Sequence, residues 1–184
     1  MPPEAVIFDL FGTLVRDITP TVYAALLHRM AGLMNVQPGA FQKAWNNDTG
    51  RFIEGTPNTT NGFLDRLIED NGWEPPIDGI AEAARGWDDF IKGPLEPYQE
   101  SDLVLDALRS KGFKLGLISN AYPGVPDAWD QCPLARRVDH VVFSCKVGFK
   151  KPELEIYRIA ADGIGTTPRR CVYVGNGYGS ELQG

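Results

Sequence analysis

The spacing of hydrophobic residues changes character along the chain. Residues 5–10 form a short, nearly continuous apolar run, which predicts a strand buried on both faces of a parallel sheet. Between residues 20 and 92 the apolar positions recur every three or four residues, which predicts four helices and no strand. After residue 97 predicted strands and helices alternate, as they do in parallel sheets with right-handed crossovers.

The first strand and the alternating segment are expected to share one sheet. The predicted elements are strands at 5–10, 113–118, 138–144 and 171–174, helices around 103–108 and 152–163, and a Pro- and Gly-rich loop over 122–133. Because the helical segment interrupts this sheet, it is predicted to be an inserted cap over residues 16–93, with a core made of 1–15 and 94–184. Trp45 and Trp87 fall at helix-period positions and are predicted to lie in the interior of the cap.

Composition and charge exclude several classes of protein. Hydrophobic residues make up 43% and charged residues 23% of the chain, as in ordinary globular proteins. The formal net charge of −6 argues against nucleic acid or an anionic membrane as a partner. The chain has neither a signal-peptide pattern nor a stretch of roughly 20 apolar residues, so we expect a cytoplasmic protein that acts on a small molecule. Three Cys and two dispersed His do not predict a zinc site.

Polar side chains stand where the predicted strands end. Ligands bind outside the carboxyl ends of parallel strands, so these residues are expected to form one site. They are Asp9, Ser119, Asn120, Lys150, Lys151, Asn176 and Glu181. A partly desolvated carboxylate such as Asp9 can attack an electrophile, while Ser119 and a Lys supply donors for negative charge. Asp9 together with two further oxygen ligands would suit Mg²⁺.

Each of these residues also has a simpler interpretation when it is taken alone. Asp9 is compatible with a turn residue that bonds to its own loop, and Ser119–Asn120 with ordinary loop chemistry. Lys150–Lys151 is compatible with a solvated pair, and Glu181 with the surface of a helix. The joint order and spacing of the residues favour a functional site.

Four segments resemble, in order, the four motifs of the haloacid dehalogenase (HAD) superfamily. They are VIFDLFGTLV at 6–15, LISN at 117–120, GFKKPELEIY at 148–157 and VGNGYGSELQG at 174–184. The helical insertion falls at the first of the two positions where this superfamily carries caps. The resemblance covers nearly the whole chain, and the expected fold class is therefore α/β, a Rossmann-like parallel sheet with an inserted α-helical cap.

The resemblance also implies roles for individual residues. For catalysis it implies Asp9 as nucleophile, Ser119 as donor and Lys151 as charge-stabilising amine. For substrate binding it implies Phe11, Gly12, Thr13 and Asn120, and for Mg²⁺ it implies Asp9, the Phe11 carbonyl, Asn176 and Glu181. Most members of the superfamily are phosphatases or related phosphotransferases and a minority are dehalogenases, so we expect a hydrolase that acts on a small anionic substrate.

Two positions depart from the pattern of the superfamily's phosphatases. Phe11 stands where those enzymes usually carry a second Asp that protonates the leaving oxygen, and loss of such a group typically costs about 10²–10⁴-fold in rate. An aromatic residue there resembles the dehalogenase branch, in which halide leaves without a proton. Asn176 stands where an Asp is usual, so Glu181 would be the only charged motif-four ligand and Mg²⁺ is expected to bind weakly.

Three functions stay open from the sequence. The leading one is a phosphatase-like hydrolase, the second is a 2-haloacid dehalogenase-type hydrolase, and the third is an impaired or truncated relative that at most binds ligands. The third draws on Phe11 and Asn176, and on a chain that stops at Gly184, about one βα unit of roughly 30 residues earlier than expected for this superfamily. Such a shortage would leave the strand at 171–175 as an apolar sheet edge.

Overall fold

The computed structural model describes the backbone of residues 2–183 and all of their side chains except those of residues 179 and 180. Met1 and Gly184, which the predicted core includes, lie outside the described residues. The strands are β1 (Ala5–Phe8), β2 (Lys114–Ser119), β3 (His140–Phe143) and β4 (Cys171–Val174). The α-helices are α1 (Pro20–Leu33), α2 (Pro38–Ile53), α3 (Thr60–Asn71), α4 (Ile77–Ile91), α5 (Ser101–Ser110), α6 (Val125–Asp130), α7 (Ser144–Val147) and α8 (Leu154–Ile164). Three short 3₁₀ helices cover Pro133–Arg137, Pro168–Arg170 and Tyr178–Gln183.

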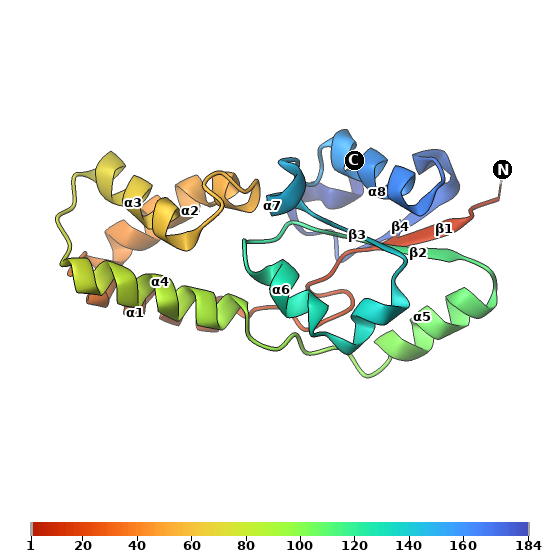
Figure 1. Cartoon of the computed structure of the whole chain (residues 1–184), viewed down its shortest axis with the longest axis horizontal. Helices are drawn as coiled ribbons and strands as arrows, with labels where there is room; N and C mark the ends of the chain where they lie inside the picture. The colour runs from red at the N-terminus through yellow and green to blue at the C-terminus, as the bar shows by residue number, and fades with distance from the viewer. Residues whose placement is uncertain (1, 184) are drawn as a thin grey trace.

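The four strands form one parallel sheet in the order β3-β2-β1-β4 (Figure 1). Phe8 of β1 pairs with Leu117 of β2 on one side and with Val174 of β4 on the other, so the carboxyl ends of these strands lie at one edge. All four residues of β1 are buried, which explains its continuous apolar sequence. The predicted α/β fold with a parallel sheet is confirmed.

Helices cover both faces of the sheet. Alternate residues of β1 point to opposite faces, so Ile7 belongs to one apolar cluster and Val6 and Phe8 to another. The Ile7 cluster includes Ile156 of α8, whereas the other includes Leu105 of α5. Figure 1 shows the corresponding layers, with α8 above the sheet and α5 and α6 below it. The result is a three-layer core of helix, sheet and helix.

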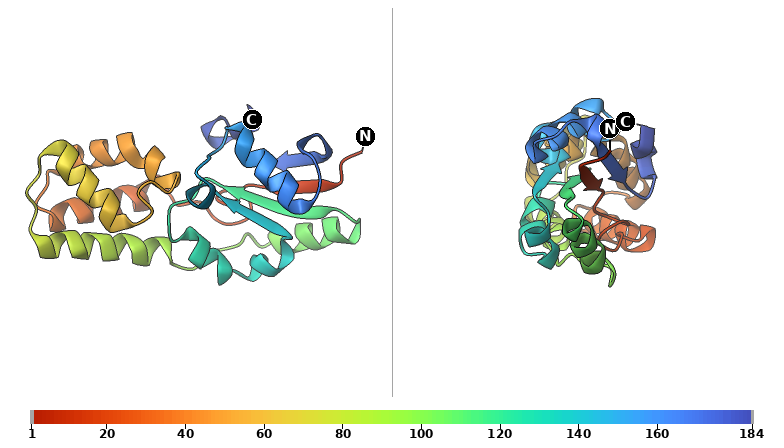
Figure 2. Two further views of the ribbon diagram at one scale, coloured as in Figure 1. Left: turned by 45° about the horizontal axis from the view of Figure 1, so that its top comes forward. Right: turned by 90° about the vertical axis from the view of Figure 1, so that its right-hand side faces the viewer.

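Helices α1–α4 gather at the end of the molecule opposite the chain's N-terminus, and we call them the helical block (Figures 1 and 2). α1 begins where the Thr19 hydroxyl accepts a hydrogen bond from the Val22 amide and Pro20 takes the first helical turn. The helices fall where the hydrophobic spacing predicts them. Within the described residues, no helix is both long and apolar enough to cross a membrane.

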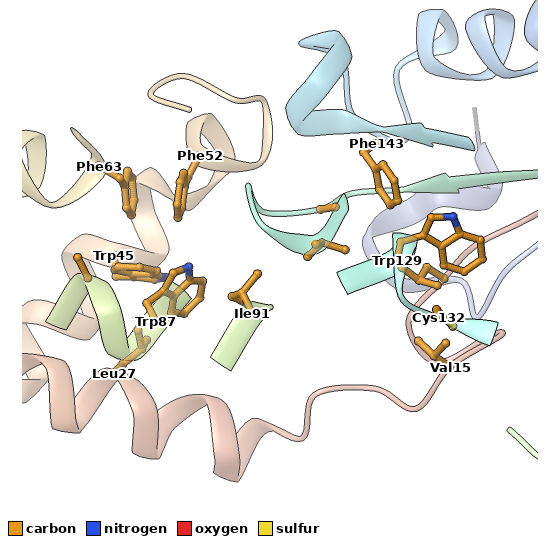
Figure 3. Packing of buried hydrophobic residues seen from close by; sticks show 14 of the residues in the cluster. Val15, Leu27, Trp45, Phe52, Phe63, Trp87, Ile91, Trp129, Cys132 and Phe143 are labelled. Carbon is orange, nitrogen blue, oxygen red and sulfur yellow. The ribbon is translucent and has the colours of Figure 1, made fainter. Parts of the chain in front are cut away.

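Aromatic residues fill the interior of the helical block (Figure 3). The rings of Trp45 and Trp87 have centroids 4.4 Å apart, and those of Phe52 and Phe63 stack at 4.5 Å. All four side chains are fully buried, which confirms the prediction that both tryptophans lie in the interior. Tyr122, from the loop after β2, joins this cluster with its ring 5.0 Å from Trp87. The helical block and the face of the sheet covered by α5 therefore share one apolar core.

The structure differs from the predicted elements in several places. The strand expected over 138–144 ends at Phe143, and Ser144 begins the short helix α7. Residues 122–133 were expected to be a loop, but they contain α6, in which Pro126 occupies the first turn and the apolar face buries Trp129. The prediction was wrong because Pro favours a helix start as well as a loop. The helix expected to end at Gly163 continues to Ile164, and Gly165 ends it in the left-handed conformation at φ 73°.

The stacked aromatic cluster is expected to dominate the stability of the helical block. Phe63→Ala should lower the free energy of unfolding by about 3–5 kcal/mol, because it removes a buried ring that contacts both Phe52 and Trp45. Ile77→Ala, at a position that is 82% exposed on α4, is the control and should change stability by less than about 0.5 kcal/mol. Urea unfolding measures the free energy of unfolding of both variants. Equal losses of stability would contradict the dominant role of the aromatic cluster.

Candidate active site

The carboxyl edge of the sheet brings the predicted polar residues together. Asp9 directly follows β1, and its backbone amide donates to the Val174 carbonyl of β4 at 2.8 Å. Ser119 is the last residue of β2, the strand on the other side of β1. Both side chains are almost fully buried. The sheet thus places a carboxylate and a hydroxyl at adjacent strand ends.

Lys151 lies at the centre of this site. Its Nζ is 2.5 Å from Asp9 Oδ1, 2.5 Å from Glu181 Oε2 and 3.0 Å from the Tyr173 hydroxyl. The Lys151 side chain is only 5% exposed, so the alternative of a solvated lysine does not hold for it. Lys150, by contrast, pairs with Glu54 near the surface. A buried ammonium thus joins carboxylates that are far apart in sequence.

Asn120 fixes the backbone of Lys151. Its Nδ2 donates to the Lys151 carbonyl at 3.1 Å, and its Oδ1 accepts from the Lys151 amide at 2.7 Å. The side-chain amide is therefore used to position Lys151. The predicted contact between Asn120 and substrate remains a prediction.

Glu181 is held from several directions and does not lie on a helix surface. Its Oε1 accepts from the Gly177 amide at 2.9 Å, and its Oε2 accepts from the Tyr173 hydroxyl at 2.7 Å. Tyr157 of α8 donates to its backbone carbonyl. Only 2% of the residue is exposed. These contacts fix the carboxylate that faces Lys151.

Sequence reasoning missed both tyrosines. Tyr173 stands in the short apolar strand β4, and Tyr157 stands in α8, six residues after Lys151. Their rings meet edge to face with centroids 5.4 Å apart. The sequence offered only a general signal for their roles, because the hydroxyl of a buried tyrosine usually has a hydrogen-bond partner.

The two carboxylates differ in proton affinity. Burial raises the pKa of Asp9 above its ordinary value and outweighs the opposing charge and hydrogen bond of Lys151. Burial acts in the same direction on Glu181, but there the hydrogen bonds from Lys151 and Tyr173 prevail, and the pKa lies below its ordinary value. Glu181 is therefore the more firmly ionised partner of Lys151.

The loop after Asp9 forms a tight turn that is closed by backbone hydrogen bonds. The Gly12 amide donates to the Val15 carbonyl at 2.8 Å, and the Thr13 amide donates to the Leu10 carbonyl at 3.3 Å. Gly12 has φ 71°, and a Cβ there would come within 2.4 Å of Asn176 Nδ2, so this close approach requires glycine. Among the described residues, no group hydrogen-bonds the buried hydroxyl of Thr13.

Several of the oxygens that the sequence assigned to Mg²⁺ are already engaged. Asn176 Nδ2 donates to the Phe11 carbonyl at 3.1 Å, and Asn176 Oδ1 accepts from the Tyr178 amide at 2.9 Å. Lys151 stands between Asp9 and Glu181. Within residues 2–183, no group of three or more His, Cys, Asp or Glu side chains could hold a metal ion. As arranged, these residues do not fit Mg²⁺.

The helical block rests directly on loops that carry site residues. Thr49 of α2 donates to the Tyr122 hydroxyl at 3.0 Å, three residues after Ser119. Ser144, which follows β3, donates to the Ile53 carbonyl and accepts from the Ala121 amide at 2.9 Å. These contacts connect the end of α2 to the loops after β2 and β3.

A cavity of about 770 Å³ opens at this junction. Its charged lining residues come from both sides and are Glu54, Asp88, Lys92, Asp127 and Lys146. None of the residues of the Asp9–Lys151–Glu181 cluster lines it. The cavity is therefore adjacent to the helical block rather than part of the cluster.

The family model for haloacid dehalogenase-like hydrolases matches residues 3–183. The chain belongs to this family. The match covers all four motif regions and the helical block, so the resemblance seen in the motifs extends over the chain. The relatives of this chain are therefore expected to be hydrolases, phosphatases among them.

Two of the curated relatives that this chain matches are the following phosphatases. A glyceraldehyde 3-phosphate phosphatase from Methanothermobacter thermautotrophicus is 34% identical over 93 residues, which are 49% of this chain and 40% of the relative. A phosphoglycolate phosphatase from Aquifex aeolicus is 24% identical over 177 residues, 94% of this chain and 76% of the relative. The chain spans about half the length of the first curated relatives it matches, with 40% and 52% of their residues aligned.

Solved HAD structures share the fold. A HAD family enzyme from Bacteroides thetaiotaomicron superposes with a TM-score of 0.65 at 19% identity, over 94% of this chain and 84% of that one. At this identity the likeness establishes the fold and leaves the substrate open.

The opposite pKa shifts predict opposite effects on stability. At pH 7, Glu181→Gln should lower the free energy of unfolding by about 1–3 kcal/mol, because it removes a buried charge that Lys151 and Tyr173 bond. This difference should shrink as the pH falls below 4.5, where the wild-type glutamate loses the same charge.

Asp9→Asn is the paired comparison. The raised pKa of Asp9 means that its ionised form costs folding free energy at pH 7, so this variant should be no less stable than the wild type. Urea unfolding as a function of pH checks both variants, and equal destabilisation at pH 7 would contradict the assigned directions.

Proposed function

We propose that this protein is a hydrolase that uses Asp9 to attack a small anionic substrate and forms a covalent aspartyl intermediate. The observation that carries the proposal is the buried Asp9 carboxylate at the end of β1, with one oxygen held by Lys151 at 2.5 Å. That ion pair orients the carboxylate and leaves its Oδ2 as the attacking atom.

Donors around Asp9 supply the electrostatic part of the reaction. Ser119 ends the neighbouring strand, and Thr13 carries a buried hydroxyl that no described residue bonds. Together with the Lys151 ammonium they would stabilise negative charge on the group under attack. An anionic substrate suits this set of donors better than a neutral one does.

The preferred chemistry is phosphatase-like. Asp9 Oδ2 forms a bond to phosphorus while the bond from phosphorus to the leaving oxygen breaks, and water then attacks phosphorus to release phosphate and regenerate the carboxylate. Phe11 cannot give a proton to the leaving oxygen. The substrate should therefore be a phosphate ester whose leaving group is already a weak base. The two phosphatase relatives support this class without identifying the substrate.

Phe11 specifically favours a second candidate, a 2-haloacid dehalogenase-type reaction. There Asp9 Oδ2 bonds to carbon as halide departs with the electron pair of the carbon–halogen bond, so no acid is needed. Water then attacks the aspartyl carbonyl carbon, which releases a hydroxy acid and a proton. A chain that performs neither reaction would be the impaired relative that at most binds ligands.

We also propose that the helical block serves as a cap over this chemistry. It lies between β1 and the rest of the sheet in sequence, and its α2 rests on the loops after β2 and β3. A cap in this position would exclude water and select a small-molecule substrate. A cytoplasmic location remains a prediction.

A panel of aryl phosphates, alkyl phosphates and 2-haloacids tests the proposal. We expect release of phosphate from aryl esters faster than from alkyl esters, and Asp9→Asn should lower turnover by at least about 10⁴-fold because it removes the nucleophile. Asp65→Asn, the same change at an exposed position on α3, is the control and should keep full activity. Turnover that survives Asp9→Asn unchanged would rule out the mechanism.

Single turnover in H₂¹⁸O separates the two chemistries. If water attacks phosphorus, the label appears in phosphate and Asp9 stays unlabelled. If water attacks the aspartyl carbonyl, one ¹⁸O enters the Asp9 carboxylate. Mass spectrometry of the Asp9 peptide should find no label with an aryl phosphate, and label there would overturn the phosphatase route.

A further inference from the structure

We infer that the Lys151 ammonium takes the place of a divalent cation, so that this site works without bound Mg²⁺. Asn176 alone predicts that Mg²⁺ binds weakly. The contacts around Phe11, Asn176, Asp9 and Glu181 carry the inference further, because they engage most of the oxygens that a metal would need.

The Lys151 ammonium occupies the space between the two carboxylates. Asp9 Oδ1 and Glu181 Oε2 each lie 2.5 Å from the same nitrogen atom of Lys151. Mg²⁺ binds oxygen at about 2.0–2.1 Å, so an ion bridging these two oxygens would overlap the ammonium. The Tyr173 hydroxyl, 3.0 Å from the nitrogen, adds a third oxygen partner. The buried ammonium is thus held much as a small cation would be.

The neutral oxygens of Phe11 and Asn176 also have hydrogen-bond partners. The Phe11 carbonyl accepts a hydrogen bond from Asn176 Nδ2 at 3.1 Å, so the amide presents an N–H where a metal would bind the carbonyl. Turning the amide over would break this bond and also the 2.9 Å bond that Asn176 Oδ1 accepts from the Tyr178 amide. Glu181 Oε1 is likewise taken by the Gly177 amide. Access for a metal therefore requires several hydrogen bonds to break.

Asn176 also packs closely against the loop that follows Asp9. A Cβ on Gly12 would lie 2.4 Å from Asn176 Nδ2, so the amide sits directly against the Gly12 backbone. The Asn176 amide therefore covers the Phe11 carbonyl, and Lys151 fills the space between the Asp9 and Glu181 carboxylates. Both barriers are side chains of this sequence, so substitution can remove each one separately.

Metal binding tests the inference without any need for turnover. Mn²⁺ serves as the probe, followed by electron paramagnetic resonance, with Mg²⁺ as competitor. The wild-type protein should show no saturable binding. Asn176→Asp replaces the N–H donor with a charged oxygen and should produce saturable Mn²⁺ binding, at least about tenfold tighter than the weakest binding the measurement detects. Asn46→Asp, the same change on the exposed side of α2, is the matched control and should behave like the wild type.

Lys151→Met is a second variant, which should also gain Mn²⁺ binding because it frees Asp9 and Glu181. Removing the ammonium leaves two buried carboxylates uncompensated, so circular dichroism must confirm its fold. Asn176→Asp avoids this difficulty because Asn176 is exposed. Saturable Mn²⁺ binding by the wild type that Glu181→Gln abolishes would overturn the inference, as would a failure of both Asn176→Asp and folded Lys151→Met to gain binding. These readouts are independent of whether any substrate is hydrolysed.

Discussion

The structure of the site depends on the burial of one ammonium group between two carboxylates. A lone charge in this position would be very unfavourable, because burial removes hydration that a protein interior does not replace. Lys151 pairs with both Asp9 and Glu181, and Glu181 is the partner that stays more firmly ionised. β1, the loop before α8 and the 3₁₀ helix after β4 supply the three groups, so the whole sheet must assemble before the charges are compensated.

The hydrogen bonds around the cluster make its charge distribution unequal. Glu181 receives bonds from Gly177, Tyr173 and Lys151, whereas Asp9 depends on Lys151 for its compensating charge. The better-compensated carboxylate stays ionised and holds the ammonium in place. The less compensated one keeps a basic oxygen, which is the property that a nucleophile requires.

The sequence predicted those features that depend on local pattern. Four strands were found because buried parallel strands are continuous apolar runs, and Asp9, Ser119 and Lys151 were found because they follow such runs or a recognisable motif. α6 was missed because its Pro and Gly signals are shared by loops and helix starts. The roles of Tyr157 and Tyr173 depend on contacts between α8, β4 and the chain near Glu181, which no local pattern encodes.

Lys150 and Lys151 are neighbours in sequence but serve different parts of the molecule. The first pairs with Glu54 at the end of α2, and the second pairs with Asp9. A single peptide unit thus separates the contact with the helical block from the charge that orients Asp9. The helical block and Asp9 are thus connected to the core through two adjacent side chains of one dipeptide.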